Sequence, residues 1–500
     1  MRALLSVYDK TGLVELASGL SELGWELVAS GNTAKALDDA GVAHVAVADL
    51  TGFPEMLGGR VKTLHPRVHG GILADRSVPE HMADLAAQGI APIDLVVSNL
   101  YPFETSPSIE TIDIGGPAMV RAAAKNHAYV GIVTSPADYA AVLDELRDCG
   151  ALSDETRRRL ARTAFAHTAR YDAAIVSWFD DDDPLPPSLH LTFERAEVCR
   201  YGENPHQHGA RYRSGPGWWD GVVQHAGTAL SYLNIFDTDA AWRLVHELAE
   251  DAGEGVCAVI VKHANPCGAA VAVDLAAAYA RALEGDAVSA FGGIVALGGE
   301  VTDEVAERVA EGPQADVIVA RSFTPGAVER LVARRKATRL LSAPAPEHAG
   351  RQVRTLGTAA LVQDPDDVVS GPGRWRVASA RRPTEAEWKD LVLAWRLCAR
   401  TTSNAIVVVA GGQAVGVGAG QQSRVVAAEL AVGKAGARAA GAAGASDGFF
   451  PFPDGLEVLA RAGVSAVVQP GGSVRDGEVV EAADAAGVAM VLTGERHFRH

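Results

Sequence analysis

A lysine and a histidine stand side by side in the segment Val261–Gly268 (VKHANPCG), which follows a short apolar run typical of a buried strand. Histidine is the side chain best suited to proton transfer near pH 7, and such transfer is worth roughly 10²–10⁴ in rate. A lone histidine is more often structural. Here Lys262 adds a cation and Asn265 an amide beside His263, so the segment predicts acid–base chemistry.

Two cations in the segment Gly58–Pro66 (GGRVKTLHP) predict a site for an anion. Arg60 and Lys62 are two residues apart, so their side chains point the same way if the segment is extended. A solvated basic loop is the alternative. The carboxylate of Asp113 between two isoleucines, and the cation Lys125 on a predicted helix, favour a reactive site instead.

Two further segments each follow a predicted strand and offer backbone N–H groups to an anion. Ser30–Thr33 (SGNT) opens a helix whose positive dipole end adds to these groups, although helix capping alone also explains its Ser and Thr. Ser6–Gly12 (SVYDKTG) repeats the arrangement and adds Lys10. A chain with a formal charge of −17 must hold any phosphate in such local clusters, because its general field repels anions.

Other segments of the C-terminal part supply groups that could line a flat ring. Leu230–Ile235 (LSYLNI) and Ser289–Gly293 (SAFGG) combine small and aromatic residues, and Arg200–Gln207 (RYGENPHQ) places an arginine beside a tyrosine. Gly416–Arg424 (GVGAGQQSR) resembles a phosphate loop but lacks the Walker lysine and spacing. Phe449–Asp454 (FFPFPD) equally suits an apolar core.

Apolar runs alternate with helical patterns before residue 180, which predicts a parallel sheet with helices on both faces. Ligands of such sheets lie at the carboxyl ends of the strands. The predicted strands are Ala3–Val7, Glu26–Ala29, Val45–Ala48, Leu95–Ser98 and Val130–Val133, and the predicted helices are Leu13–Leu23 and Thr33–Ala40.

The run Asp180–Pro187 (DDDDPLPP) marks a domain boundary, because its like charges repel and its prolines remove backbone donors. We place domains at 1–183 and 195–500, joined by a linker at 184–194. The second domain is again mixed α/β, with no evident internal repeat and an exposed loop over Leu341–Arg351. Its predicted strands are Ala258–Val261, Gly293–Leu297, Val317–Ala320, Ala405–Val409 and Ala466–Gln469.

The composition of the 500 residues excludes several classes of protein. No apolar run reaches the ~20 residues that span a bilayer, and the acidic charge argues against nucleic-acid polymers as partners. The five cysteines form no C-x-x-C pair, which argues against a disulfide framework and a cysteine zinc site. Met1–Lys10 has the pattern of a strand and not of a signal peptide, so we expect a cytoplasmic protein.

The motifs of the first domain resemble the cyclohydrolase half of the bifunctional purine biosynthesis family. The matching strings are SVYDKTGLVE, GRVKTLHPRVHGGIL, NLYPF and IDIGGPAMVRAAAKNHAYV. The resemblance implies a methylglyoxal synthase-like, doubly wound parallel sheet and a dehydrative ring closure, in which the substrate's carboxamide nitrogen attacks its own formyl group. One departure is Asn32, where the family often has Gly. Because Asn tolerates a left-handed φ, we expect the turn to be kept.

The same resemblance implies roles for individual residues of the first domain. Lys62 would polarise the formyl oxygen, while Tyr101, Asp113 and Lys125 would handle proton transfer and positioning. The residues implied to hold the nucleotide, chiefly its phosphate, are Ser6, Lys10, Ser30, Gly31, Thr33, Arg60, Thr63, Asn99 and Gly115.

The second domain resembles the formyltransferase half of the same family. The matching strings are CRYGENPHQ, LSYLNIFDTDAAW, KHANPCGAAV, SAFGGIVAL, SNAIVVV, GAGQQSR, FFPFPDG, QPGGSVRDGEVV and GERHFRH. The resemblance implies two cytidine deaminase-like α/β subdomains and a homodimer with formyltransferase sites at the interface. It also implies that 10-formyltetrahydrofolate formylates the amino group of aminoimidazole carboxamide ribonucleotide (AICAR). The formylated product, FAICAR, would then close to inosine monophosphate (IMP). No metal is implied, and use of a monovalent cation stays open.

By the same resemblance His263 is the base or proton shuttle, Lys262 its electrostatic partner, and Asn404 a contact to the carboxamide or formyl group. Two departures are Thr402, where bacterial members often have Lys, and Arg321, where they often have Pro. The residues implied to bind the two ligands are Arg200, Tyr201, Asn234, Phe291, Gly292, Asp316, Arg424, Phe452, Asp454 and Arg496.

Two alternative functions conflict with the residues. Zinc deamination needs an H-x-E and a P-C-x-x-C motif, but Ala264 and Asn265 follow His263, and Gly268 to Ala270 follow Cys267. A purely regulatory nucleotide-binding role for the first domain leaves the reactive set of Lys62, Asp113 and their neighbours without a use.

Overall fold

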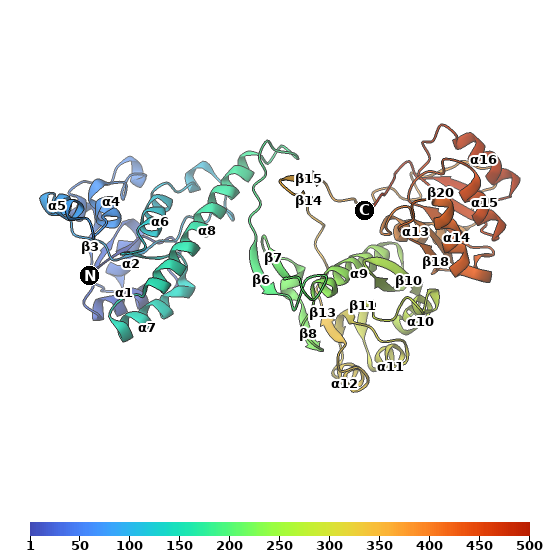
Figure 1. Ribbon diagram of the computed structural model, residues 1–500, viewed down its shortest axis with the longest axis horizontal. Coiled ribbons are helices and arrows are strands. Elements are labelled where there is room, and N and C mark those ends of the chain that lie inside the picture. The colour runs from blue at the N-terminus through green and yellow to red at the C-terminus, as the bar shows by residue number, and fades with distance from the viewer. The chain divides into compact units, whose positions relative to one another are not determined.

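The computed structural model describes residues 1–58 and 60–500; Gly59, in the predicted basic loop, lies outside the described residues. The chain forms two compact units, Met1–Thr192 and Phe193–His500 (Figure 1). The division between them falls inside the segment 184–194 that the sequence predicts as a linker.

In the described part of the first unit, five parallel strands form one sheet in the order β3-β2-β1-β4-β5. The order reverses beside β1, whose two neighbours are β2 and β4. This is the place where doubly wound sheets bind ligands. The strands are β1 (Arg2–Leu5), β2 (Glu26–Ala29), β3 (Val45–Ala46), β4 (Leu95–Val97) and β5 (Gly131–Val133).

Helices cover both faces of this sheet, as the alternating pattern predicts. Leu5 of β1 belongs to the core on one face and Leu4 to the core on the other. The helix α8 ends at Phe179, just before four aspartates, because negative charge is unfavourable at the negative end of the helix dipole. The helices are α1 (Leu13–Glu22), α2 (Gly31–Asp39), α3 (Val47–Thr51), α4 (Pro66–Leu73), α5 (Pro79–Ala87), α6 (Gly115–Lys125), α7 (Tyr139–Cys149) and α8 (Asp154–Phe179).

In the described part of the second unit, one mixed sheet of twelve strands has the order β16-β21-β20-β19-β17-β18-β10-β9-β11-β12-β13-β8. Two hairpins, β6–β7 and β14–β15, pair outside it. The strands are β6 (Glu194–Val198), β7 (Ala210–Arg213), β8 (Val223–Ala226), β9 (Val256–Lys262), β10 (Asn265–Ala272), β11 (Ile294–Val301), β12 (Val317–Phe323), β13 (Arg339–Ser342), β14 (Gln352–Leu356), β15 (Ala359–Gln363), β16 (Arg376–Val377), β17 (Ile406–Ala410), β18 (Gln413–Gly418), β19 (Ala443–Ser446), β20 (Ala466–Gln469) and β21 (Ala489–Leu492).

The large sheet contains an internal repeat. Each half consists of an edge strand, a helix, a two-strand hairpin, and three further strands separated by helices, in the same chain order and with the same pairing directions. The halves meet where β10 pairs antiparallel with β18, at Ala270 and Gln413. The helices are α9 (Tyr232–Asp251), α10 (Leu275–Gly285), α11 (Asp303–Glu311) and α12 (Pro325–Arg334) in the first half, and α13 (Glu385–Ala399), α14 (Arg424–Ala435), α15 (Asp454–Arg461) and α16 (Asp476–Ala485) in the second.

The two halves share a core on one face of the sheet and have separate cores on the other. Trp242 of α9 and Trp395 of α13 belong to the same buried cluster, which runs under strands of both halves. The remaining helices pack over two different clusters, one for each half. The two parts predicted for this region are therefore halves of a single compact unit.

No repeat is evident in the sequence because the halves have kept their topology and not their residues. Two expectations about the fold are wrong. The helix α3 begins at Val47, within the predicted strand Val45–Ala48, since so short an apolar run does not distinguish strand from helix. The predicted exposed loop begins too early, because Leu341 lies fully buried in β13.

Close backbone contact between β10 and α10 generates a first prediction. A Cβ on Gly268 would lie 2.0 Å from the carbonyl oxygen of Ala282, so Gly268→Ala should destabilise the second unit by about 1–3 kcal/mol or more. Gly433 in α14 has nothing within 4 Å of its Cβ position, and Gly433→Ala should stabilise by about 0.5–1 kcal/mol. Thermal or urea unfolding measures both changes, and equal shifts in the two variants would contradict the packing.

Candidate functional sites

The loops after β1 and β4 are tied together at the place where the strand order of the first sheet reverses. The Asn99 side-chain oxygen accepts hydrogen bonds from the backbone N–H groups of Tyr8 at 2.6 Å and Asp9 at 2.9 Å, and its amide donates to the Asp9 carbonyl at 3.1 Å. Asn99, predicted to contact the nucleotide, therefore braces the loop that carries Lys10.

The start of α2 forms a small cradle with Lys62. The hydroxyls of Ser6 and Ser30 are 3.3 Å apart, and a Cβ on Gly31 would lie 2.7 Å from the Lys62 ammonium nitrogen. Gly31 has a φ of +50°, so glycine is favoured there twice, by conformation and by space. The left-handed residue of this turn is thus Gly31, and the sequence argument that assigned the constraint to Asn32 is wrong.

The two cations of the basic loop are each paired with a carboxylate from elsewhere in the chain. Arg60 is exposed and forms an ion pair with Glu110, and Lys62 lies 3.3 Å from a carboxylate oxygen of Glu55. Both cations of the basic loop therefore already have an acidic partner. Only Lys62 of the pair reaches the cradle at α2.

Two other predicted phosphate ligands are largely engaged by the backbone. The Thr33 hydroxyl accepts from the Val7 N–H at 3.0 Å and donates to the Val7 carbonyl at 3.1 Å, which uses its only proton. Lys10 donates to the carbonyls of Val7 and Tyr8, and burial lowers its pKa more than neighbouring Asp9 raises it. One N–H of the Lys10 ammonium remains for an anion.

Asp113 lies just before the first residue of α6, with the backbone of Tyr101, Gly115 and Gly116 around its carboxylate. Burial raises its pKa, and hydrogen bonds from the backbone N–H groups of Gly116, Tyr101 and Gly115 lower it by less. The Gly116 N–H donates to Oδ1 at 2.8 Å. A Cβ on Gly115 would lie 3.0 Å from the Thr63 hydroxyl oxygen, so the basic loop also reaches this place.

The two remaining reactive residues of the first unit differ in how they are placed. The Tyr101 ring meets Tyr8 edge-on, with 5.6 Å between ring centroids, which joins it to the loop after β1. Lys125 is exposed in the last turn of α6, ten residues after Gly115, and so about 15 Å away along the helix axis. A ligand would have to extend along α6 to reach both Asp113 and Lys125.

A second cluster forms in the other unit, at the ends of neighbouring strands β9, β11 and β12. The Lys262 ammonium donates to the Gly292 carbonyl at 2.9 Å. A Cβ on Gly292 would lie 3.0 Å from that ammonium nitrogen and 3.9 Å from a carboxylate oxygen of Asp316. Lys262, Gly292 and Asp316, predicted separately from three motifs, therefore share one place.

His263 occupies the turn between β9 and β10, and its side chain is exposed. Both turn residues, His263 and Ala264, have positive φ angles, +52° and +56°. Asn265 follows, donating to the His263 carbonyl at 3.0 Å and accepting from the Thr402 N–H at 2.8 Å. The histidine turn is thus linked to the segment before β17, in the other half of the repeat.

Asn404 and Arg424 meet in that other half. The Arg424 guanidinium donates to the Asn404 side-chain oxygen at 2.7 Å and to the Ser446 hydroxyl at 2.7 Å, and it pairs with the fully buried Asp447. The Asn404 amide donates to the Gln421 carbonyl at 2.9 Å. Arg424, predicted to bind ligand, is itself buried and holds Asn404 in place.

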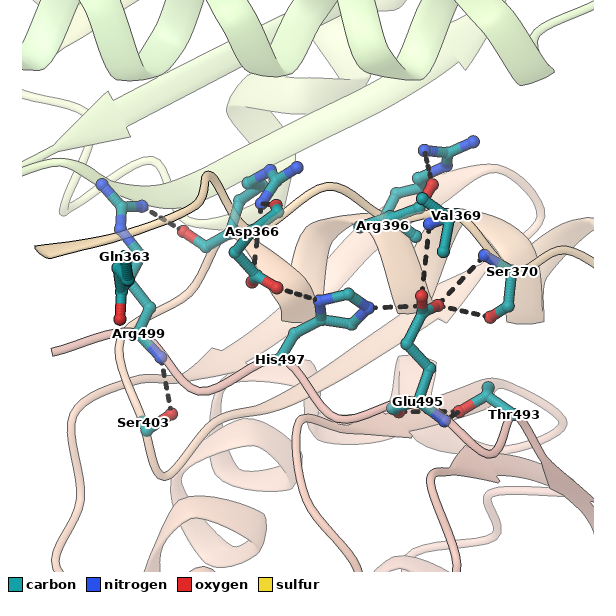
Figure 2. A network of polar contacts seen from close by, with 12 residues as sticks. Gln363, Asp366, Val369, Ser370, Arg396, Ser403, Thr493, Glu495, His497 and Arg499 are labelled. Carbon is teal, nitrogen blue, oxygen red and sulfur yellow. Dashed lines mark hydrogen bonds and ion pairs between the residues drawn. The ribbon is translucent and has the colours of Figure 1, made fainter. Parts of the chain in front are cut away.

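The last residues of the chain brace the same region (Figure 2). His497 lies between two carboxylates, with Nδ1 2.8 Å from Asp366 and Nε2 3.3 Å from Glu495, and it is almost fully buried. The Arg499 N–H then donates to the Ser403 hydroxyl at 3.1 Å. The Arg499 guanidinium donates to the Ala264 carbonyl at 3.0 Å. Sequence reasoning missed Asp366 and Asp447, since isolated aspartates near Pro or Gly have the pattern of ordinary turns.

The other predicted ligand residues of this unit make local contacts. Arg200 stacks on Tyr201 and Arg496 on Phe498, at 5.3 and 4.4 Å from the ring centroids, while Phe291 is 64% exposed. The buried Asn234 caps α9 together with Ser231. Arg475 lies over Phe452, the Asp454 carboxylate accepts from the Gly455 N–H, and the departure Arg321 is an exposed residue of β12.

Two family models match the sequence. One is AICARFT/IMPCHase bienzyme, over residues 123–434, and the other is MGS-like domain, over residues 12–126. The first covers more than half of the chain. The chain belongs to the AICARFT/IMPCHase bienzyme family. It is therefore a bifunctional enzyme of purine biosynthesis, with the AICAR formyltransferase and IMP cyclohydrolase activities that the sequence motifs implied.

A solved structure described as the crystal structure of ForH is 42% identical in sequence; the match covers 36% of this chain and 98% of that one. Its TM-score of 0.34 is too low to bear on the fold. In the described residues, helices long and apolar enough for a membrane span are absent. Groups of three or more His, Cys, Asp or Glu side chains able to hold a metal ion are likewise not found there.

The buried carboxyl of Asp113 predicts that the stability of the first unit depends on pH. Because burial raises its pKa above the ordinary value of 3.8, ionised Asp113 destabilises the first unit at pH 8, and the penalty fades as pH falls through the raised pKa. Asp113→Asn keeps an acceptor for the Gly116 N–H. It should raise the melting temperature of that unit at pH 8, by less at pH 5, while ring closure falls.

Calorimetry at the two pH values, with exposed Asp84→Asn as control, measures this difference. A melting temperature that drops at pH 8 would show that the charged form stabilises the fold.

Proposed function

We propose that each unit carries one of the two reactions: ring closure around Lys62, Tyr101 and Asp113, and formyl transfer around Lys262 and His263. The observation that supports this division most is that each cluster is assembled within one compact unit. Neither set of contacts needs a residue from the other unit.

For formyl transfer, the acceptor amine is conjugated with the substrate's carboxamide and is a weak nucleophile. A base must take its proton as the nitrogen attacks, and His263, which is exposed at a turn, would be that base. Lys262 and the Asn404 amide would stabilise the developing oxyanion, each held by its contact to Gly292 or Gln421. We propose 10-formyltetrahydrofolate as the formyl donor, on the family resemblance. As the oxyanion collapses, the bond from the formyl carbon to N10 of the folate breaks, and N10 takes the proton that the base received, which releases tetrahydrofolate.

For ring closure, the carboxamide nitrogen attacks the formyl carbon of the same molecule and water leaves. Lys62 would polarise the formyl oxygen, since its ammonium is held at the start of α2. Asp113, with a pKa raised by burial, is suited to hold and release a proton nearer to neutral pH than an ordinary carboxyl. The start of α2 and Lys10 would hold the phosphate.

We further propose that the enzyme is a cytoplasmic homodimer. The β14–β15 hairpin pairs only with itself among the described strands, and a two-stranded hairpin alone is marginally stable in water. Leu356 and Leu361, which the strand register places on one face of this hairpin, are 52% and 60% exposed. A second copy of the chain would cover this apolar surface and complete a formyltransferase site at the interface.

Reciprocal variants test the division of labour. Lys62→Ala should lower ring closure of added FAICAR about 10²–10³-fold and leave formyl transfer intact, since it removes one oxyanion donor. His263→Ala should lower formyl transfer about 10²–10⁴-fold and leave ring closure intact, since it removes the base. The absorbance of each product, measured with purified protein and each substrate in turn, follows the two reactions separately.

Exposed residues of the same types provide controls: Lys35→Ala on α2 and His348→Ala in the loop after β13 should change neither rate. Loss of both activities in Lys62→Ala or in His263→Ala would sink the assignment of one reaction to each unit.

The proposed homodimer predicts the mass of the enzyme in solution, and a lower mass when the β14–β15 hairpin is altered. Sedimentation velocity of the intact enzyme should show a dimer, and Leu361→Glu on the hairpin should shift it toward monomer and lower formyl transfer more than ring closure. Val474→Glu, at a fully exposed position elsewhere in the second unit, is the matched control. A monomeric wild-type enzyme with full formyltransferase activity would overturn the proposal.

A further inference from the structure

The internal repeat places two hairpin turns at equivalent positions, and they differ in one respect. The turn between β17 and β18 is Gly411-Gly412, with φ angles of +56° and +79°. The turn between β9 and β10 is His263-Ala264, with φ angles of +52° and +56°. Two-residue turns with positive φ at both positions strongly favour glycine or asparagine. His263-Ala264, which is the first of the two turns along the chain, therefore has a conformation that its residues disfavour.

The second turn shows how the fold holds such a hairpin. Asp390 stands five residues after the first residue of α13, and its two carboxylate oxygens accept from the N–H groups of Gly411 at 2.7 Å and Gly412 at 2.6 Å. The guanidinium of Arg281 donates to the Gly411 carbonyl from the other side. An acid thus binds the N–H groups of this turn and an arginine binds a carbonyl.

The first turn has the same two partners at hand. Asp237 stands five residues after the first residue of α9 and is 8% exposed. Burial raises its pKa, while the backbone N–H groups of Ala264 and His263 act on the carboxylate and lower it by less. Unlike Asp390, it leaves one carboxylate oxygen, Oδ1, without a hydrogen-bond partner among the described residues.

The arginine of the first turn comes from the end of the chain. Arg499 donates from Nη1 to the Ala264 carbonyl at 3.0 Å. Its own backbone is fixed by Ser403, whose hydroxyl accepts from the Arg499 N–H at 3.1 Å and whose N–H donates to the Arg499 carbonyl at 2.9 Å. The anchoring of His497 two residues earlier holds this tail against the sheet (Figure 2).

Non-glycine residues persist at positive φ only when their surroundings over-determine the conformation, and they concentrate at functional sites. Glycines in the first turn would remove the strain but also the imidazole. We propose that Asp237 and Arg499 are positioning residues that hold the His263–Ala264 turn in its left-handed conformation and so aim the His263 side chain. This inference rests on the proposed role of His263 in formyl transfer.

The repeat supplies a matched control for Asp237. Asp237→Asn and Asp390→Asn remove the same charge from equivalent turns, but only the first turn carries a proposed base. Asp237→Asn should lower kcat of formyl transfer about tenfold or more with little change in KM, because a misplaced base slows the chemical step. Asp390→Asn should leave kcat within about twofold even if the melting temperatures fall equally.

A double variant separates positioning from a general effect on folding. Adding Ala264→Gly to Asp237→Asn relieves strain at one turn residue and should restore part of the lost kcat. Equal kcat losses in Asp237→Asn and Asp390→Asn, or full kcat in Asp237→Asn, would overturn the role of Asp237.

Variants of Arg499 test the proposal independently if Asp237→Asn fails to fold. Arg499→Ala should lower kcat of formyl transfer and spare ring closure of added FAICAR, and Arg499→Lys, which retains a donor, should recover part of it. Unchanged kcat in Arg499→Ala would remove Arg499 from the proposal. The variant His263→Ala, assayed alongside, distinguishes the two failures: if it is fully active, the proposed function fails, and if it alone is inactive, only this inference fails.

Discussion

The antiparallel pairing of β10 with β18 determines where the second site forms. Ala270 pairs with Gln413 and the two strands run in opposite directions, so the start of β10 lies toward the end of β18. The start of β10 carries the histidine turn, and the segments on either side of the second hairpin carry Asn404 and Gln421. A hydrogen bond from the Thr402 N–H to the Asn265 side-chain oxygen joins the two halves at this place.

In the first unit, the strand order of the sheet brings the proposed site residues together. Its strand order reverses beside β1, so the loops after β1 and β4 leave the sheet in a common crevice. Asn99 uses its whole side chain to fasten those loops together. The groups that we propose to react come from segments near these loops: Lys62 against the start of α2, and Asp113 just before α6.

Sequence reasoning singled out the segments of both proposed sites but could not give the contacts of each side chain. Thr33, Asn99 and Arg424 have the residue types of ligand contacts, and the structure engages each of them in holding the chain. Arg60 shows the same limit, because its partner Glu110 is fifty residues away and no local pattern reveals it. The segment carrying His497 and Arg499 could be predicted as a family motif, but its contacts to Ser403 and to the His263 turn could not.

The sequence by itself determined the class of the elements and the family, and it predicted a break between two domains near the aspartate and proline run. These follow from local physics and short motifs: side-chain periodicity, charge repulsion within a few residues, and fixed spacing. The tertiary structure decided which groups are free, paired or strained. The pairing of β10 with β18, the burial of Asp113 and the clamping of the His263 turn all depend on segments far apart in the chain. Their energies therefore appear only when distant backbone groups and charges are brought together.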